Sequence, residues 1–160
     1  MPAVNPVPEE LRTVTPRLYV DGGHDAIEFY QRAFGAQQIG DIFTGPADEI
    51  IHAELRIGDA VVMLTEDTGD ESMPSRAPSA TGNIATAVMA TYWPDVDAAW
   101  QRAVDAGAEV LYPLEDQFYG DRAGRLRDPF GQQWMLSQRI EDVSPEEMAR
   151  RTAALFKSPG

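Results

Sequence analysis

The chain has 160 residues, of which 43% are hydrophobic and none is cysteine, and its 26 acidic and 13 basic residues give a formal net charge of −13. This length suits one domain with its own core, and the lack of cysteine excludes disulfides, thiolate metal sites and a cysteine nucleophile. The negative charge disfavours nucleic acid and anionic membranes as partners. No apolar run reaches the ~18 residues of a membrane span and no secretory signal pattern opens the chain, so we expect a cytoplasmic protein.

The predicted elements of the first half follow a flexible tail over residues 1–12. A strand-like run, 14–20, precedes a segment with apolar positions at helical spacing and a closing glycine, 26–36. Three further extended segments are bounded by turn residues: 37–43, 50–57 and 60–65. Residues 66–82 then collect Asp, Gly, Ser, Pro and Thr without periodicity, which predicts a linker or mobile loop.

The second half repeats this order at a spacing of about seventy positions. A strand-like run, 84–92, precedes a helix over 98–108 that shares the Gln-Arg-Ala core of the first helix. Three extended segments follow: 109–114, 119–127 with a break at Gly120, and 132–138. Ser144 as N-cap, Pro145 at the first helical position and Glu147 at the capping-box position then predict a final helix running toward Phe156.

The pattern β-α-β-β-β therefore occurs twice, which predicts an α+β fold of two βαβββ modules. Side by side, they would form a curved eight-stranded mixed sheet with the helices outside and a concave cleft for a ligand. The expected domain spans 13–140, with module one at 13–66, the linker at 67–82 and module two at 83–140. Residues 141–160 form the C-terminal helix and tail.

Short motifs link this pattern to a known family. Asp128-Pro129-Phe130-Gly131 before the last strand and Thr15-Pro16 at the first resemble the glyoxalase/bleomycin resistance/dioxygenase (vicinal oxygen chelate) superfamily. The resemblance covers 13–151. Three longer motifs look like its PhnB-like branch: 52–59, 116–122 and 140–148. The resemblance implies the βαβββ fold and a homodimer.

Enzymes of this superfamily hold a divalent metal with four side chains, usually His, Gln or Glu, from the first and last strand of each half. The resemblance places these four positions at Thr15, Met63, Val88 and Met135, and the two methionines end their modules equivalently. None of the four is a usual ligand for zinc, iron or manganese. We therefore expect no cofactor, and these four residues disfavour an enzyme without excluding one.

One strand carries a polar face. His52, Glu54 and Arg56 alternate with apolar residues, so they share the face expected to be concave. His52 and Glu54 could serve as a base with its orienting partner or as two metal ligands. The alternative is a solvated polar face with an ion pair between Glu54 and Arg56.

Aromatic and charged residues around Gly120 suit the rim of a cleft. Asp116, Tyr119 and Arg122 are the predicted contacts there, with Tyr119 able to stack on a flat ligand and donate a hydrogen bond. Alternatively, Asp121 and Arg122 pair across strands while Phe118 is core. Four more residues could line an apolar pocket for an aromatic compound: Met63, Trp93, Trp134 and Met135. Trp134 alternates away from Met135, which favours a place in the core instead.

Three functions remain open from the sequence. The leading hypothesis is a metal-independent protein that binds or sequesters a small aromatic or cationic compound. The alternative is a metal-dependent lyase, isomerase or dioxygenase with a displaced site around His52, Glu54 and Asp116. The third is an interaction module whose cleft is filled by its own side chains.

Overall fold

The computed structural model describes residues 4–156, which form two compact units. The first unit contains the described residues up to Thr86 together with Pro129–Gln132. The second contains Ala87–Asp128 and the described residues from Gln133 onward. Each unit is described by itself.

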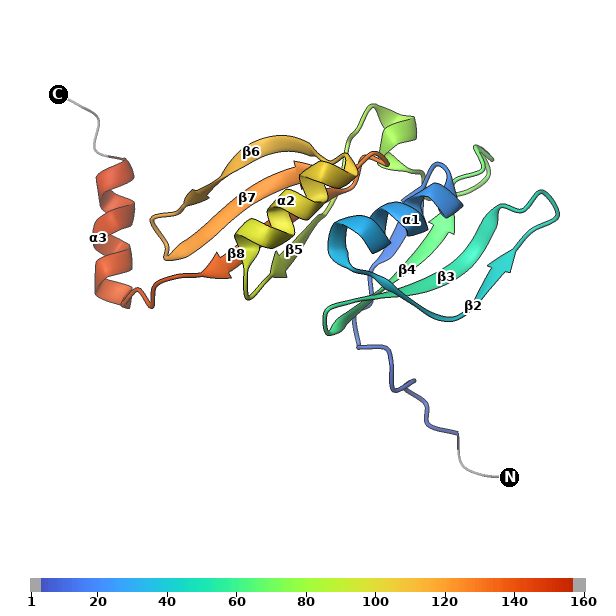
Figure 1. Cartoon of the computed structure of the whole chain (residues 1–160), viewed down its shortest axis with the longest axis horizontal. Helices are drawn as coiled ribbons and strands as arrows, with labels where there is room; N and C mark the ends of the chain where they lie inside the picture. The colour runs from blue at the N-terminus through green and yellow to red at the C-terminus, as the bar shows by residue number, and fades with distance from the viewer. Residues whose placement is uncertain (1–3, 157–160) are drawn as a thin grey trace. The chain divides into compact units, whose positions relative to one another are not determined.

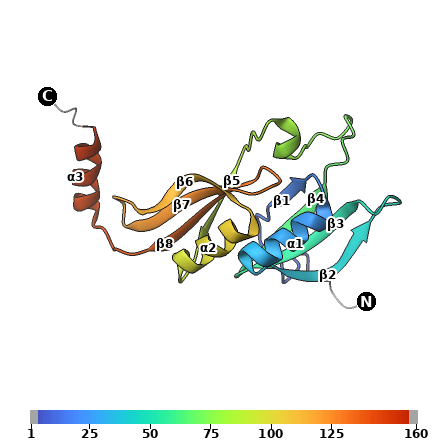
Figure 2. The ribbon, with the colours of Figure 1, turned by 45° about the horizontal axis from the view of Figure 1, so that its top comes forward.

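The first unit holds one βαβββ module (Figure 1). Its sheet has the order β1-β4-β3-β2, in which β1 runs parallel to β4 and the other neighbours are antiparallel. Helix α1 covers one face of this sheet, as both Figures 1 and 2 show. The elements are β1 (Arg17–Val20), α1 (Gly23–Phe34), β2 (Gln37–Thr44), β3 (Ile50–Ile57), β4 (Ala60–Glu66) and the 3₁₀ helix η1 (Pro78–Thr81).

The second unit repeats the module with the sheet order β5-β8-β7-β6, again with its first strand parallel to its last. Helix α2 covers one face of this sheet, and α3 follows the last strand (Figures 1 and 2). The elements are β5 (Val88–Tyr92), α2 (Val96–Ala106), β6 (Glu109–Asp116), β7 (Asp121–Arg127), β8 (Gln133–Arg139) and α3 (Pro145–Leu155).

The predicted α+β fold of two βαβββ modules is confirmed. Within residues 4–156 the eight strands pair as two four-stranded sheets, one in each unit, rather than as one hydrogen-bonded ladder. The first strand of each module is shorter than predicted. β1 begins at Arg17, directly after a proline that has no N–H to donate, and β5 begins at Val88, opposite the first residue of β8. None of the helices in residues 4–156 has the length and apolar character needed to cross a membrane.

The two module helices bury different amounts of side chain. Helix α1 buries three aromatic rings, Phe29, Tyr30 and Phe34, and the ring of Phe130 lies within 6.1 Å of the first two. Burying one such side chain contributes about 1.5–3 kcal/mol. Helix α2 buries only small residues: Val96, Ala99 and Ala103. The first unit therefore has the larger aromatic core.

The Asp-Pro-Phe-Gly motif joins β7 to β8. The carbonyl of Phe130 accepts from Ser79 N at 3.2 Å, and Gln132 Nε2 donates to the carbonyl of Tyr19 at 2.9 Å. Gly131 has φ +86°, and a Cβ there would lie 2.6 Å from Ser79 N, so only glycine fits. The motif is thus a tight turn whose aromatic ring completes the core of the first unit.

The segment 67–82, expected as a linker or mobile loop, is organised by one carboxylate. The side chain of Asp67, only 2% exposed, accepts from the backbone N–H of Gly69 and Ala77 and pairs with Arg76 at 2.9 Å. Ala77 and Pro78 are buried, and η1 starts at Pro78. This segment therefore packs as part of the first unit.

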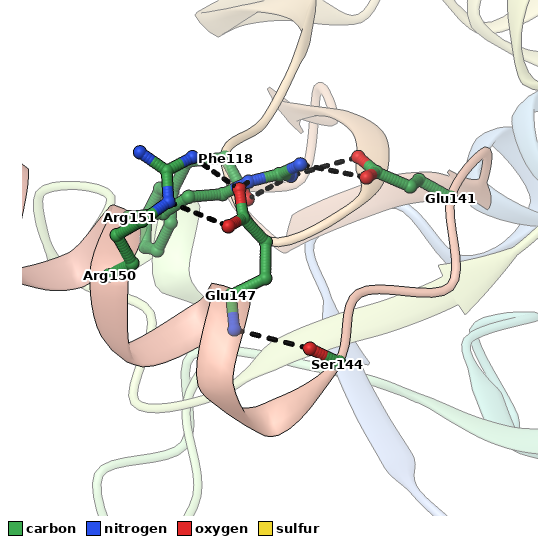
Figure 3. A network of polar contacts seen from close by, with 6 residues as sticks. All are labelled: Phe118, Glu141, Ser144, Glu147, Arg150 and Arg151. Carbon is green, nitrogen blue, oxygen red and sulfur yellow. Dashed lines mark hydrogen bonds and ion pairs between the residues drawn. The ribbon is translucent and has the colours of Figure 1, made fainter.

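Helix α3 begins as predicted, with Ser144 Oγ accepting from Glu147 N at 3.2 Å. No residue of this helix is buried. Polar contacts hold it instead: Arg151 pairs with Glu141 and Glu147 at 2.7 Å and donates to the carbonyl of Phe118 at 2.9 Å (Figure 3). The helix is therefore fastened to the turn between β6 and β7.

Residues 4–12 of the expected tail contain no helix or strand, although Glu10 forms an ion pair with Arg56. The remaining parts of the two predicted tails, 1–3 and 157–160, lie outside the described residues.

Candidate functional site

The second unit has a pocket on the sheet face opposite α2. Even-numbered residues of β7 face the helix, because a Cβ on Gly124 would lie 2.5 Å from the ring of Trp100 in α2. Odd-numbered residues such as Ala123 and Arg125 lie on the other face. The pocket there has a volume of about 290 Å³ and is lined by Tyr112, Pro113, Glu115, Gln117, Tyr119, Ala123, Gly124, Arg125 and Met135.

Arg125 is the one cationic side chain that lines this pocket. It stands opposite Tyr112 in the β6–β7 ladder, and its guanidinium carbon lies 5.4 Å from the centre of that ring. Its Nε is buried and has no hydrogen-bond partner among the described residues. The pocket wall therefore carries a cation beside an aromatic ring, and this cation includes a buried donor without a partner within residues 4–156.

The turn after β6 supplies the polar end of the pocket. Gln117 donates through Nε2 to the carbonyls of Glu115 and Ala123, at 3.3 Å each, which fixes this turn against the sheet. Burial, followed by the nearby carboxylate of Asp121, raises the pKa of Tyr119. Tyr119 therefore keeps its phenol proton at neutral pH and presents a hydrogen-bond donor.

The other predicted contacts of this region lie outside the pocket. Arg122 pairs with Asp97 of α2 at 2.8 Å and with Asp116 at 3.0 Å, on the helix side of the sheet. The ring of Trp93 lies under the guanidinium of Arg102, and its Nε1 donates to Thr91 Oγ1 at 2.8 Å.

The alternative of an Asp121–Arg122 pair with Phe118 in the core is wrong. Asp121 accepts from the hydroxyl of Tyr92 at 2.7 Å, and Phe118 is 39% exposed. Residues 121 and 122 point to opposite faces of β7, so each finds its partner on a different side of the sheet.

The first unit carries the predicted His52–Glu54 pair. Both side chains are about three-quarters covered, and His52 Nε2 lies 3.3 Å from Glu54 Oε1. The apolar residues between and after them are buried, as the alternation predicts. Arg56 pairs with Glu10, so the predicted ion pair between Glu54 and Arg56 is wrong.

Arg17 of β1 extends across this polar face and contacts His52. Its guanidinium lies 3.5 Å from His52 Nδ1, 3.4 Å from Met63 Sδ and 3.3 Å from Thr65 Oγ1. Because arginine only donates, His52 Nδ1 is the acceptor, and in the neutral ring Nε2 carries the proton that faces Glu54. Both ring nitrogens of His52 are therefore engaged within the protein.

The family of the chain follows from its sequence as a whole. The family model described as Glyoxalase/Bleomycin resistance protein/Dioxygenase superfamily matches residues 12–136. The chain belongs to this superfamily. Its two βαβββ modules are the fold that the superfamily resemblance implied.

Proteins with similar sequences match most of the chain. An uncharacterized protein of Mycobacterium bovis is 42% identical over 139 residues, which cover 84% of this chain and 88% of the relative. Protein YjdN of Escherichia coli K12 is 25% identical over 132 residues, which cover 71% of this chain and 85% of YjdN.

Solved structures with this fold include TioX from Micromonospora sp. ML1 and protein PA1353 from Pseudomonas aeruginosa. TioX has a TM-score of 0.58 and 22% identity, covering 83% of this chain and 100% of TioX. PA1353 has a TM-score of 0.62 and 20% identity, covering 81% of this chain and 99% of PA1353. At these identities the likeness concerns the fold alone.

The superfamily's metal positions do not fit a metal in this chain. Strand register places Arg17 opposite Met63 and Ala90 opposite Met135, so Thr15 and Val88 each stand two residues before the position beside a methionine. A guanidinium, a methyl group and two thioethers are poor ligands for zinc, iron or manganese. Within residues 4–156, no three His, Cys, Asp or Glu side chains come close enough together to hold a metal ion.

Of the predicted contact residues, Tyr119 and Met135 line the pocket, whereas His52, Glu54 and Met63 lie together in the first unit. Tyr112 and Arg125 line the pocket and were missed. The period of two that identified the polar face of β3 applies equally to β7, and there it separates Arg125 from Arg122.

Proposed function

We propose that this protein binds a small, flat aromatic compound in the pocket of the second unit, without a resident metal. The observation that carries the proposal is the pocket itself, whose wall combines the rings of Tyr112 and Tyr119 with the thioether of Met135. Aromatic rings favour stacked or edge-to-face partners, and methionine adapts to the edge of a ring. A volume of about 290 Å³ is at the lower end for ligand pockets and suits one or two fused rings.

An aromatic ligand is favoured over a cationic one. The net charge of −13 attracts cations to the protein as a whole. Inside the pocket, however, Arg125 places a positive charge beside Tyr112, which repels a cation stacked on that ring, and the one carboxylate among the described lining residues, Glu115, is exposed. A pocket left open by its own side chains also argues against the pure interaction module.

Nuclear magnetic resonance titration with 2-naphthylmethanol, a neutral two-ring compound, tests this function. We expect saturable shifts at the pocket residues, and at least fivefold weaker binding in Tyr112→Ala, which removes a ring that is 61% exposed. Phe43→Ala is the matched control, because Phe43 is a similarly exposed ring in the first unit. Shifts confined to the first unit, or no saturable shift with any aromatic probe, would contradict the proposal.

The metal-dependent alternative is supported by the His52–Glu54 pair. The guanidinium of Arg17 beside His52 opposes it, because a bound cation there would meet a positive charge. Thermal melts with Zn²⁺, Ni²⁺, Mn²⁺ and Fe²⁺ test it, since a metal that binds the native state raises the melting temperature. A raised melting temperature that His52→Ala abolishes would favour the alternative.

Membership of the PhnB-like branch, supported by the motifs at 52–59, 116–122 and 140–148, is a further part of this proposal. So is a homodimer, which the superfamily resemblance implies. Sedimentation velocity over a wide range of protein concentrations checks the oligomeric state.

A further inference from the structure

The arginines of β7 differ in how their charges are matched. Arg127, two positions after Arg125 on the same face, pairs with Glu109 at 2.8 Å. Arg122 has two carboxylate partners, Asp97 and Asp116. Arg125 has no ion-pair partner among the described residues, in a chain with twice as many acidic as basic residues.

The Nε of Arg125 adds a second, independent observation. It is a buried donor without an acceptor in the described part of the chain. Buried polar groups in native proteins are nearly always hydrogen-bonded, and leaving a charged one unsatisfied is costly. The contact with the ring of Tyr112 balances the charge in part but supplies no acceptor for the N–H groups.

The surroundings of Arg125 define what can supply that acceptor. Glu115 also lines the pocket, but it is exposed and forms no ion pair with Arg125 among the described residues. Tyr119 adds a phenol donor to the same wall, whereas the amide nitrogen of Gln117 already donates to the carbonyls of Glu115 and Ala123. The pocket therefore combines rings with a phenol donor and a cation, and the one carboxylate of its described lining, Glu115, is exposed.

We propose that the ligand is an aromatic carboxylate, an inference that rests on the proposed function. Its ring lies among Tyr112, Tyr119 and Met135, and its carboxylate accepts hydrogen bonds from Arg125. A planar guanidinium offers two parallel N–H donors, a geometry that matches the two oxygens of a carboxylate. A neutral aromatic compound would satisfy the rings and leave the cation unmatched. A cationic one would meet repulsion.

The test compares three probes of similar shape, 2-naphthoate, 2-naphthylmethanol and 2-naphthylmethylammonium, by titration of ¹⁵N-labelled protein. We expect 2-naphthoate to bind at least tenfold more tightly than the alcohol, as a charge-assisted hydrogen bond predicts, and the ammonium to bind most weakly. The Nε–H resonance of Arg125 should move downfield with naphthoate, as a donor to a carboxylate does, and should not move downfield with the alcohol.

Arg125→Gln should remove the preference for naphthoate and change the affinity for the alcohol by less than about threefold. Arg127→Gln is the matched control, because it removes a paired arginine from the same strand face and should keep the preference. Arg125→Lys keeps the charge without the planar fork and should lose part of the preference. If Arg125→Gln does not fold, the lysine variant and the Nε–H shift of the unaltered protein still test whether Arg125 binds the carboxylate.

The outcomes separate this inference from the proposed function. If naphthoate binds no more tightly than the alcohol, the inference that the ligand is a carboxylate is wrong, while the proposal that the pocket binds an aromatic compound is retained. Binding of neither probe overturns both. A preference for naphthoate that survives in Arg125→Gln also overturns the inference, because the acceptor would then lie elsewhere.

Discussion

The two units share one topology and differ in what stands beside the methionine at the end of each module. In the first unit Arg17 lies opposite Met63 and reaches His52, so a long side chain covers the open face. In the second, Ala90 lies opposite Met135, and this methionine borders a pocket. The same ladder position therefore holds a long cationic side chain in the first unit and a methyl group in the second unit, where the pocket lies.

The largest expected effect concerns the cores. Phe29 and Ala99 occupy equivalent positions in α1 and α2, because the Gln-Arg-Ala cores align. Phe29→Ala should lower the free energy of unfolding by about 3–5 kcal/mol through the cavity it leaves. Ala99→Gly should cost about 1 kcal/mol, mainly through helix propensity. Urea denaturation measures both, and equal losses would contradict the contrast between the two cores.

Asp67 should make the stability of the first unit dependent on pH. Burial would raise its pKa, but the hydrogen bonds from Ala77, Gly69 and Arg76 outweigh burial and hold the pKa below its ordinary value of 3.8. A lowered pKa contributes stability above 3.8 that is lost as the pH falls through the folded-state value.

Asp67→Asn should therefore lower the free energy of unfolding by about 1.5–3 kcal/mol at pH 7. The gap between the two proteins should close as the pH drops below 3.8. Denaturation at several pH values measures it, with Asp59→Asn, an exposed carboxylate of the same unit, as control. A gap that persists at pH 2 would mean that the charge is not what stabilises this segment.

Met135 and Met63 stand at equivalent positions of the two modules, so substituting each of them tests which unit binds the ligand. Met135→Ala should weaken binding of the naphthyl probes about fivefold, because it removes apolar contact worth about 1 kcal/mol. Met63→Ala, the equivalent change in the first unit, should leave their affinity unchanged. Titration of both variants checks this, and a larger effect of Met63→Ala would place the ligand in the first unit.

The smallest expected effect is local to α3. Hydrogen bonds from Arg150 and Arg151 lower the pKa of Glu147 to about 2, and Arg151 likewise lowers the pKa of Glu141. Because both pKa values are lowered, the attachment of α3 should be complete above the ordinary value of 4.5 and weaken as the pH falls toward 2.

Relaxation measurements on the backbone amides of 145–155 should show increasing motion over that pH range, with β7 and β8 unchanged. Glu147→Gln should reproduce part of this motion at pH 7. Equal motion of helix and sheet would show that the whole unit, rather than α3, responds to pH.

The fold was largely predictable because repetition and hydrophobic period both identify elements. The Gln-Arg-Ala repeat located α1 and α2, and the alternation around His52 predicted β3 with its correct ends. The first and fifth strands were predicted to begin too early, and both errors have the same cause. A strand begins where its hydrogen-bonded neighbour begins to pair with it, and a single sequence does not show the register between distant strands.

The pocket was less predictable for the same reason. Tyr119 and Met135 were identified by residue type, but the importance of Arg125 depends on a partner that is missing. Contacts across strands and with α2 decide which arginine of β7 has a carboxylate within reach. Arg122 reaches Asp97 of α2, and Arg127 reaches Glu109 of β6, whereas Arg125 reaches neither. The packing of 67–82 likewise rests on a single carboxylate, which bonds to residues two, nine and ten positions further along the chain, rather than on any periodic pattern.

The turn at Pro129–Gln132 has a consequence for how the chain acquires its structure. Gln132 bonds to Tyr19 across 113 residues, and Phe130 completes an aromatic cluster begun by α1. During synthesis, every strand of the first sheet emerges long before the ring that finishes its core. Contacts so distant along the chain slow folding, and the exposed apolar surface favours aggregation meanwhile. The N-terminal half should therefore reach its final stability only after most of the C-terminal half has been made.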